Sequence, residues 1–112
     1  MHEMKLQDRY FNYILNGTKR IELRLLDEKR SKIKIGDTIK FVNIENNNEF
    51  ICNVIGLYNS RSFDDLFKDF DISILADSSM TKDELKNVLY EFYTKELQEK
   101  YGVVGIRLEL IK

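Results

Sequence analysis

The sequence predicts one α+β domain with a mostly antiparallel sheet that curls into a small β-barrel. Short segments of alternating apolar and polar residues indicate at least four strands, and their spacing does not fit the strand–helix–strand units of a parallel sheet. At least three other segments repeat their apolar residues with helical spacing. The length of 112 residues and the apolar share of 43% fit a single domain over residues 1–112.

The first elements are a short helix and a strand. Residues 8–16 place their apolar side chains on one helical face, and Gly17 can end this helix because glycine tolerates a left-handed backbone. Residues 18–26 alternate between apolar and charged side chains, which is typical of a half-buried strand. Residues 27–34 are charged and break this alternation, so they predict a loop that can include one helical turn.

A hairpin and a second helix follow. Residues 38–45 and 49–58 predict two strands, joined by a turn at the three asparagines 46–48, because asparagine also tolerates left-handed conformations. Gly56 predicts a bulge near the end of the second strand. A serine then provides the N-cap of a helix over residues 63–70.

The C-terminal part contains a long helix and the last strand. Residues 71–80 are the least regular stretch, and we expect their few apolar side chains to pack against the core. Thr81 and Glu84 have the spacing of a capping box, which opens a helix that runs to about Leu97. Residues 104–110 alternate cleanly and predict a strand that closes the domain.

The strand at residues 18–26 is the most distinctive segment of the chain. Its apolar set, which we expect to point toward the core, is Ile21, Leu23 and Leu25. The other face carries Arg20, Glu22 and Arg24, and Lys19 lies where the strand begins. Four charges of mixed sign on one short strand lose hydration energy unless they pair or meet a ligand. This strand is therefore the candidate functional site.

Charge is distributed unevenly along the chain. Residues 1–41 hold 10 lysines and arginines against 6 acidic residues, whereas residues 42–112 hold 8 against 13. The basic excess gathers around the charged strand. A local basic patch is typical of a partner that carries phosphate. An ordinary solvated surface explains the same excess equally simply.

Several classes of protein do not fit the composition. The sequence lacks an apolar run long enough to span a membrane and an N-terminal signal segment, so we expect a cytoplasmic protein. Cys52 is the one cysteine and lies in an apolar run, which predicts a buried structural thiol. The one histidine, His2, lies at a terminus that we expect to fray. We therefore expect no metal site and no cofactor.

Gly17, Lys19, Glu22 and Arg24 match the G-x-K-x-x-E-x-R signature of ASCH domains, which belong to the PUA-like group of small β-barrels. The order of elements is also similar, up to a closing Tyr-Gly-Val-Val-x-x-Arg segment at residues 101–107. On this resemblance the chain is identified as an ASCH domain of the small single-domain bacterial type. The resemblance implies a PUA-like barrel whose cleft binds RNA or a nucleobase-like ligand.

The resemblance also implies an alternative function. One branch of small bacterial ASCH proteins hydrolyses the amide of acetylated cytidine, with the signature lysine as nucleophile or base, a threonine and a downstream glutamate. Lys19 matches that lysine, Glu22 stands at the threonine position, and the downstream acid falls near Ser78, one residue after Asp77. In an amidohydrolase that acts on acylated nucleosides, Glu22 or Asp77 would carry the proton.

Three roles remain open for the charged strand. In a binding protein, the basic side chains neutralise phosphate and a tyrosine stacks on a base; the ligand-binding candidates are Lys19, Arg20, Glu22, Arg24 and Tyr58. In an amidohydrolase, the catalytic candidates are Lys19, Glu22 and Asp77. In a purely structural role, Glu22 and Arg24 link the strand to its neighbours. The expected partner is RNA or a nucleoside in the first case and an acylated nucleoside in the second.

Overall fold

The computed structural model describes residues 1–111, which form one curled five-stranded sheet and six helices. The sheet order is β1-β3-β4-β5-β2. β1 pairs with β3 in parallel, and the other neighbours pair antiparallel. The strands are β1 (His2–Leu6), β2 (Ile21–Leu25), β3 (Thr38–Asn43), β4 (Glu49–Ser60) and β5 (Val103–Leu110). The α+β class and the mostly antiparallel, barrel-like sheet are confirmed.

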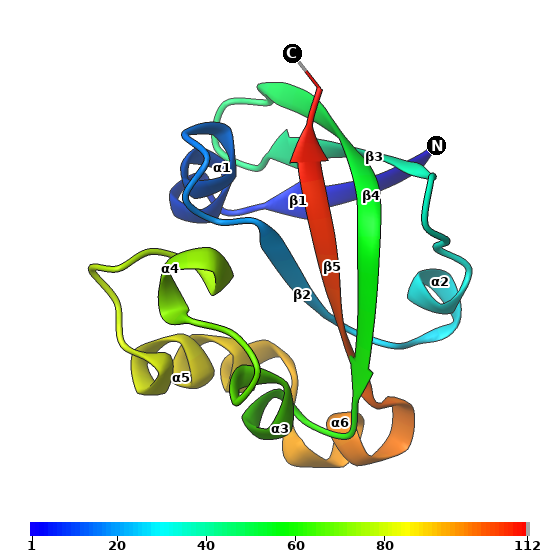
Figure 1. Ribbon diagram of the computed structural model, residues 1–112, viewed down its shortest axis with the longest axis vertical. Helices are drawn as coiled ribbons and strands as arrows, with labels where there is room; N and C mark the ends of the chain where they lie inside the picture. The colour runs from blue at the N-terminus through cyan, green and yellow to red at the C-terminus, as the bar shows by residue number, and fades with distance from the viewer. Residues whose placement is uncertain (112) are drawn as a thin grey trace.

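The helices lie in two groups around the sheet. α1 follows β1 directly and α2 lies in the connection between β2 and β3, whereas α3 to α6 gather beside and below the lower part of the sheet in the view of Figure 1. Their bounds are α1 (Asp8–Leu15), α2 (Glu28–Ser31), α3 (Phe63–Phe67), α4 (Ile72–Leu75), α5 (Lys82–Phe92) and α6 (Lys95–Tyr101). The sequence predicted about three helices; the three additional ones are α2, α4 and α6, of four, four and seven residues.

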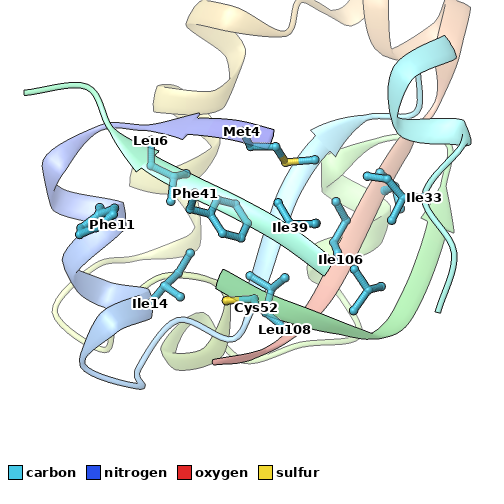
Figure 2. Packing of buried hydrophobic residues seen from close by; sticks show 12 residues of the cluster. Met4, Leu6, Phe11, Ile14, Ile33, Ile39, Phe41, Cys52, Ile106 and Leu108 are labelled. Carbon is cyan, nitrogen blue, oxygen red and sulfur yellow. The ribbon is translucent and has the colours of Figure 1, made fainter. Parts of the chain in front are cut away.

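Two apolar clusters stabilise this arrangement. The first fills the inside of the curled sheet and includes Phe41, Ile39, Ile106 and the fully buried Cys52 (Figure 2). The second lies between β2 and helices α3 to α5, and β2 contributes Ile21, Leu23 and Leu25 to it. The predicted core-facing set of β2 and the predicted burial of Cys52 are confirmed.

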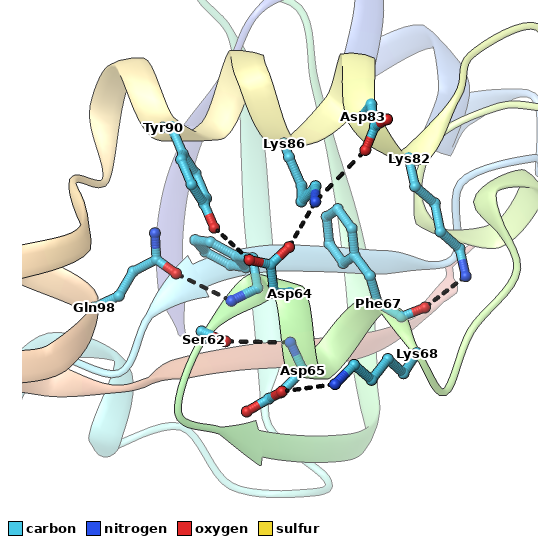
Figure 3. A network of polar contacts seen from close by, with 11 residues as sticks. Ser62, Asp64, Asp65, Phe67, Lys68, Lys82, Asp83, Lys86, Tyr90 and Gln98 are labelled. Atoms are coloured by element: carbon cyan, nitrogen blue, oxygen red, sulfur yellow. Dashed lines mark hydrogen bonds and ion pairs between the residues drawn. The ribbon is translucent and has the colours of Figure 1, made fainter.

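Polar contacts fix the helical layer (Figure 3). Asp64 of α3 accepts from Lys86 Nζ of α5 at 2.6 Å and from the Tyr90 hydroxyl at 3.2 Å. Lys82 Nζ donates to the carbonyl oxygen of Phe67 at 2.6 Å. These bonds hold α5 against α3. They therefore also fix the orientation of the face of α5 that points away from α3.

Local sequence signals explain several turns. Gly17 has φ +89° just beyond the C-cap of α1, and Asn47 has φ +61° in the turn between β3 and β4, as predicted. The register between β4 and β5 shifts between Val54 and Gly56, which confirms the predicted bulge. Thr81 and Glu84 form the predicted capping box at the start of α5.

Two expectations are wrong. The N-terminus does not fray, because β1 adds to the sheet beside β3, and His2 Nε2 lies 2.9 Å from Asp37 Oδ2. The long C-terminal helix is not continuous. It is interrupted after Phe92, and α6 begins with Thr94 as its N-cap.

Within residues 1–111 no helix is long and apolar enough to cross a membrane. The same part of the chain holds no group of three or more histidine, cysteine, aspartate or glutamate side chains arranged to bind a metal ion.

Candidate functional site

The two edge strands of the sheet, β1 and β2, meet through side chains. They occupy opposite ends of the strand order, yet Arg24 Nη2 in β2 donates to the carbonyl oxygen of Lys5 in β1 over 2.8 Å. Lys29 Nζ also donates to a β1 carbonyl, that of Glu3, over 3.1 Å. Cations thus satisfy backbone oxygens that face away from β3, which is one way to protect a sheet edge. We call this junction of β1 and β2 the seam.

Lys19 is buried where the chain enters β2. Gly17 ends α1 and turns the chain, and the Lys19 side chain is then only 3% exposed. Its Nζ donates to the carbonyl oxygens of Ile21 at 2.5 Å and Leu75 at 2.7 Å, and lies 3.4 Å from Glu22 Oε1. An ammonium has three N–H donors, so these three oxygens match its capacity. Lys19 thereby connects β2 to α4.

Glu22 and Arg24 lie on the face of β2 that is turned into the curled sheet. Their cross-strand partners in β5 are Ile106 and Val104, which belong to the inner apolar cluster, and such partners share a face. Glu22 Oε2 accepts from Arg24 Nε at 2.9 Å and lies 2.8 Å from Arg24 Nη2. The Glu22 carboxylate, 5% exposed, therefore lies between Arg24 and Lys19.

The three charges shift one another's ionisation. Burial alone raises the pKa of Glu22, but Arg24 and Lys19 outweigh it and hold that pKa below its ordinary value. Burial lowers the pKa of Lys19, and the neighbouring Glu22 carboxylate only partly opposes this. Glu22 is therefore ionised at neutral pH, and the Lys19 amine gives up its proton more readily than an exposed lysine.

A pocket of about 240 Å³ opens over this charged group. Lys19, Glu22 and Arg24 line it. An apolar stripe of α5, made of Leu85, Val88, Leu89 and Phe92, also contributes to its lining. Exposure rises along this stripe from 1% at Leu85 to 55% at Phe92, so it extends from the bottom of the pocket to its rim.

Only some of the site residues predicted from the sequence line the pocket. Lys19, Glu22 and Arg24 converge on the pocket, whereas Arg20, Tyr58 and Asp77 do not line it. The Arg20 side chain is exposed, with Nε 3.4 Å from the carbonyl oxygen of Gly17.

The other two side chains have local partners. The Tyr58 ring in β4 packs against Phe70, with 4.9 Å between the ring centroids. Asp77 lies between α4 and α5, where its Oδ2 accepts from the backbone N–H and the hydroxyl of Ser79 at 3.0 and 2.5 Å.

Two aromatic residues also line the pocket, Tyr10 of α1 and Tyr93 after α5, and nothing in the sequence had indicated Tyr93. The Tyr10 ring lies near Lys19, with Nζ 6.0 Å from the ring centroid. No local pattern in the sequence places the first helix, which carries Tyr10, beside the charged strand. The apolar stripe of α5 ends at Phe92, which is 55% exposed at the pocket rim.

The comparison with known proteins now identifies the family, because the family model described as ASCH domain matches residues 4–112. The chain belongs to the ASCH domain family. Its curled sheet is the PUA-like barrel of that family, and the predicted membership is confirmed. The signature residues Lys19, Glu22 and Arg24 of this ASCH domain are the ones that meet at the pocket.

Solved structures agree with the family. The crystal structure of hypothetical protein PH0355 is 38% identical, with 97% of each chain covered and a TM-score of 0.86. The solution structure of protein PF0455 from Pyrococcus furiosus is 32% identical, covers 99% of this chain and 97% of that one, and has a TM-score of 0.78. A mutant of ZmASCH from Zymomonas mobilis is 9% identical over 96% of this chain and 66% of that one, with a TM-score of 0.68, and shares the fold. No curated protein matches this ASCH domain.

Proposed function

We propose that this ASCH domain binds a nucleobase in the pocket at the seam, either in a modified nucleoside or as an unpaired base of RNA. The observation that supports this most is the contrast within the pocket lining, which combines the buried charged group of Lys19, Glu22 and Arg24 with the apolar stripe that ends in Phe92. A nucleobase has flat apolar faces and a polar edge, so the apolar and the charged parts of the lining each match one part of it.

The size and charge of the pocket fit this ligand. Small-molecule sites commonly begin at about 300 Å³, so a pocket of about 240 Å³ suits one ring system more than a folded polymer. Two cations and one carboxylate leave the group with one net positive charge, which favours a neutral or anionic ligand. The exposed Lys5 beside the pocket is placed to meet a phosphate attached to the base.

Calorimetric titration with nucleosides and a short single-stranded RNA tests the proposal. Arg24→Ala should weaken binding, and Arg24→Lys should restore it only in part, because lysine keeps the charge but loses the fork of donors. Arg20→Ala is the matched control, since this arginine belongs to the same strand region but does not line the pocket. Absence of binding by the native protein, or equal losses in the Arg20 and Arg24 variants, would contradict the proposal.

Salt dependence separates the two forms of the ligand. Each phosphate contact made by single-stranded RNA contributes about −0.7 to the slope of log K against log salt. A nucleoside carries no phosphate and should show almost no slope. A slope for RNA near that of the nucleoside would indicate that the base alone is bound.

A second candidate function is hydrolysis of an acylated nucleoside, and one observation favours it: burial lowers the pKa of the Lys19 amine, which lines the pocket. A neutral amine can act as base or nucleophile toward an amide. In the overall reaction, water adds across the amide, and acetylated cytidine yields cytidine and acetate. Glu22 beside Lys19 is the proposed proton carrier. The third candidate, Asp77, is held by Ser79 outside the pocket lining.

Incubation with acetylated cytidine, followed by chromatography, tests this reaction. The expected product is cytidine, formed by the native protein and lost in Lys19→Met, which keeps the apolar stem of the side chain. Asp77→Asn is the control, because an asparagine oxygen can still accept from Ser79. Turnover that survives Lys19→Met would exclude Lys19 as the reactive group, and absence of any product would leave binding as the function.

A further inference from the structure

α5 has two faces with different tasks. One face contributes four apolar side chains to the lining of the pocket: Leu85, Val88, Leu89 and Phe92. The other face contacts α3 through three polar side chains at four-residue spacing: Lys82, Lys86 and Tyr90. These three do not line the pocket. Because a helix moves as one stiff body, contacts on the second face decide where the first face lies.

Asp64 of α3 holds the middle of α5. Its Oδ1 accepts from Lys86 Nζ at 2.6 Å, and its Oδ2 accepts from the Tyr90 hydroxyl at 3.2 Å (Figure 3). Lys86 and Tyr90 lie about 6 Å apart along the helix axis, yet both reach the same carboxylate. A shift of α5 along its axis would lengthen one of the bonds, and a rotation would move both donors away. Asp64 therefore opposes both movements.

Both ends of α5 are bonded to α3 as well. At the first end, Lys82 Nζ donates to the carbonyl oxygen of Phe67 at 2.6 Å. Just beyond the last residue of α5, the carbonyl oxygen of Tyr93 accepts from Gln98 Nε2 at 2.9 Å, and Gln98 Oε1 accepts from the backbone N–H of Phe63 at 3.0 Å. The bonds to Phe67 and Phe63 are drawn in Figure 3. α3 thus contacts α5 or the residue after it at three levels.

Apolar packing alone does not fix α5 to this extent. Leu85 is the one buried residue of the helix, and exposure rises to 55% at Phe92. Apolar burial is also non-directional, so it tolerates sliding and rotation that a hydrogen bond does not. The polar bonds to α3 therefore carry most of the positional information for the apolar stripe.

We infer that Asp64 is a positioning residue for the pocket, because it sets the place of the apolar stripe of α5 from outside the pocket. Asp64 does not line the pocket and its side chain is about half exposed, so it acts only through Lys86 and Tyr90. The consequence for binding rests on the proposed binding of a nucleobase. The consequence for the position of the stripe does not need a ligand.

Titration of the intact protein with cytidine and with adenosine tests the consequence for binding. Asp64→Ala should weaken whichever nucleoside the native protein binds by about two- to fivefold, the range of one exposed ion pair. Asp65→Ala is the matched control, because this neighbouring carboxylate also pairs with a lysine, Lys68 at 3.2 Å, but has no bond to α5. Adding Lys86→Met to Asp64→Ala should cost little more, since both changes remove the same bond.

Methyl NMR spectra of the free protein test the position of the stripe. In Asp64→Ala, the methyl resonances of Leu85, Val88 and Leu89 should shift, whereas those of Ile39 and Ile106 in the inner apolar cluster should not. Asp64→Asn keeps one acceptor oxygen, so its spectrum and its affinity should lie between those of the native protein and Asp64→Ala. A merely structural role of Asp64 would lower the melting temperature without moving the stripe resonances.

The outcomes separate the inference from the proposed function. If the native protein binds neither nucleoside, the proposed function fails, and the methyl spectra alone decide whether Asp64 positions the stripe. If the native protein binds but Asp64→Ala keeps its affinity and its stripe resonances, the inference alone is wrong. Equal changes in Asp64→Ala and Asp65→Ala also overturn it. Weaker binding together with shifted stripe resonances in Asp64→Ala, and neither in Asp65→Ala, supports it.

Discussion

Replacing Glu22 by glutamine tests the electrostatics of the site most directly. The substitution keeps the size of the side chain and removes its charge, so that Lys19 and Arg24 remain buried without a counter-ion. Removing one partner of a buried ion pair costs about 3–5 kcal/mol, against about 0–1 kcal/mol for an exposed pair. We therefore expect a loss of about 3 kcal/mol in the free energy of unfolding at neutral pH, which is a large part of the ~5–15 kcal/mol typical of a domain.

The pH dependence of this loss has a definite sign. The pKa of Glu22 is lowered in the folded protein, so its charge stabilises the fold above the pKa of the unfolded chain, and this contribution disappears as pH falls through the lower, folded pKa. The glutamine variant has no such titration. The difference in stability between the two proteins should thus be largest near neutrality and shrink in acid.

Urea unfolding of both proteins at several values from about pH 7 down to about pH 3 measures this difference. Glu91→Gln is the control, because Glu91 is an exposed carboxylate on α5. A loss below about 1 kcal/mol at neutral pH would place the pair in the range of surface ion pairs. A loss that stays constant down to acid pH would show that the charge of Glu22 does not cause it. Either result refutes the reasoning.

Three further outcomes follow from burial and backbone geometry. Burial raises the pKa of Cys52 to about 12, so iodoacetamide should not alkylate the native protein in mildly alkaline buffer but should react after denaturation, as mass spectrometry would show. Leu85→Ala should reduce the free energy of unfolding by about 2–5 kcal/mol in urea titrations, because Leu85 is 1% exposed. Gly17→Ala should lower the free energy of unfolding by about 1–2 kcal/mol, because φ is +89° at this position. Gly56→Ala is not a suitable control, because the added Cβ would contact the Tyr58 side chain.

The fold was predictable where the pattern is local. Alternation in the sequence indicated β2, the β3–β4 hairpin and β5, and turn residues such as Gly17 and Asn47 marked their ends. β1 was missed because it has only five residues and becomes a strand through parallel pairing with β3, which lies more than 30 residues away in the sequence. The interruption at Tyr93 was missed for the same reason: it depends on Gln98 and on a distant backbone N–H, that of Phe63.

The site was predictable only in part. The charged face of β2 identified Lys19, Glu22 and Arg24 because four charges on one short strand need partners. The sequence could not show that Lys19 is enclosed by the carbonyl oxygens of Ile21 and Leu75, one of them 56 residues away. It also could not separate Arg20, which points to solvent, from its neighbours.

The seam explains why fold and site share residues. A sheet whose edges paired fully would satisfy the β1 carbonyls with backbone N–H groups; here Arg24 supplies the bond to Lys5 instead, and the same guanidinium lies at the pocket. Truncating Arg24 should therefore reduce stability and ligand affinity together.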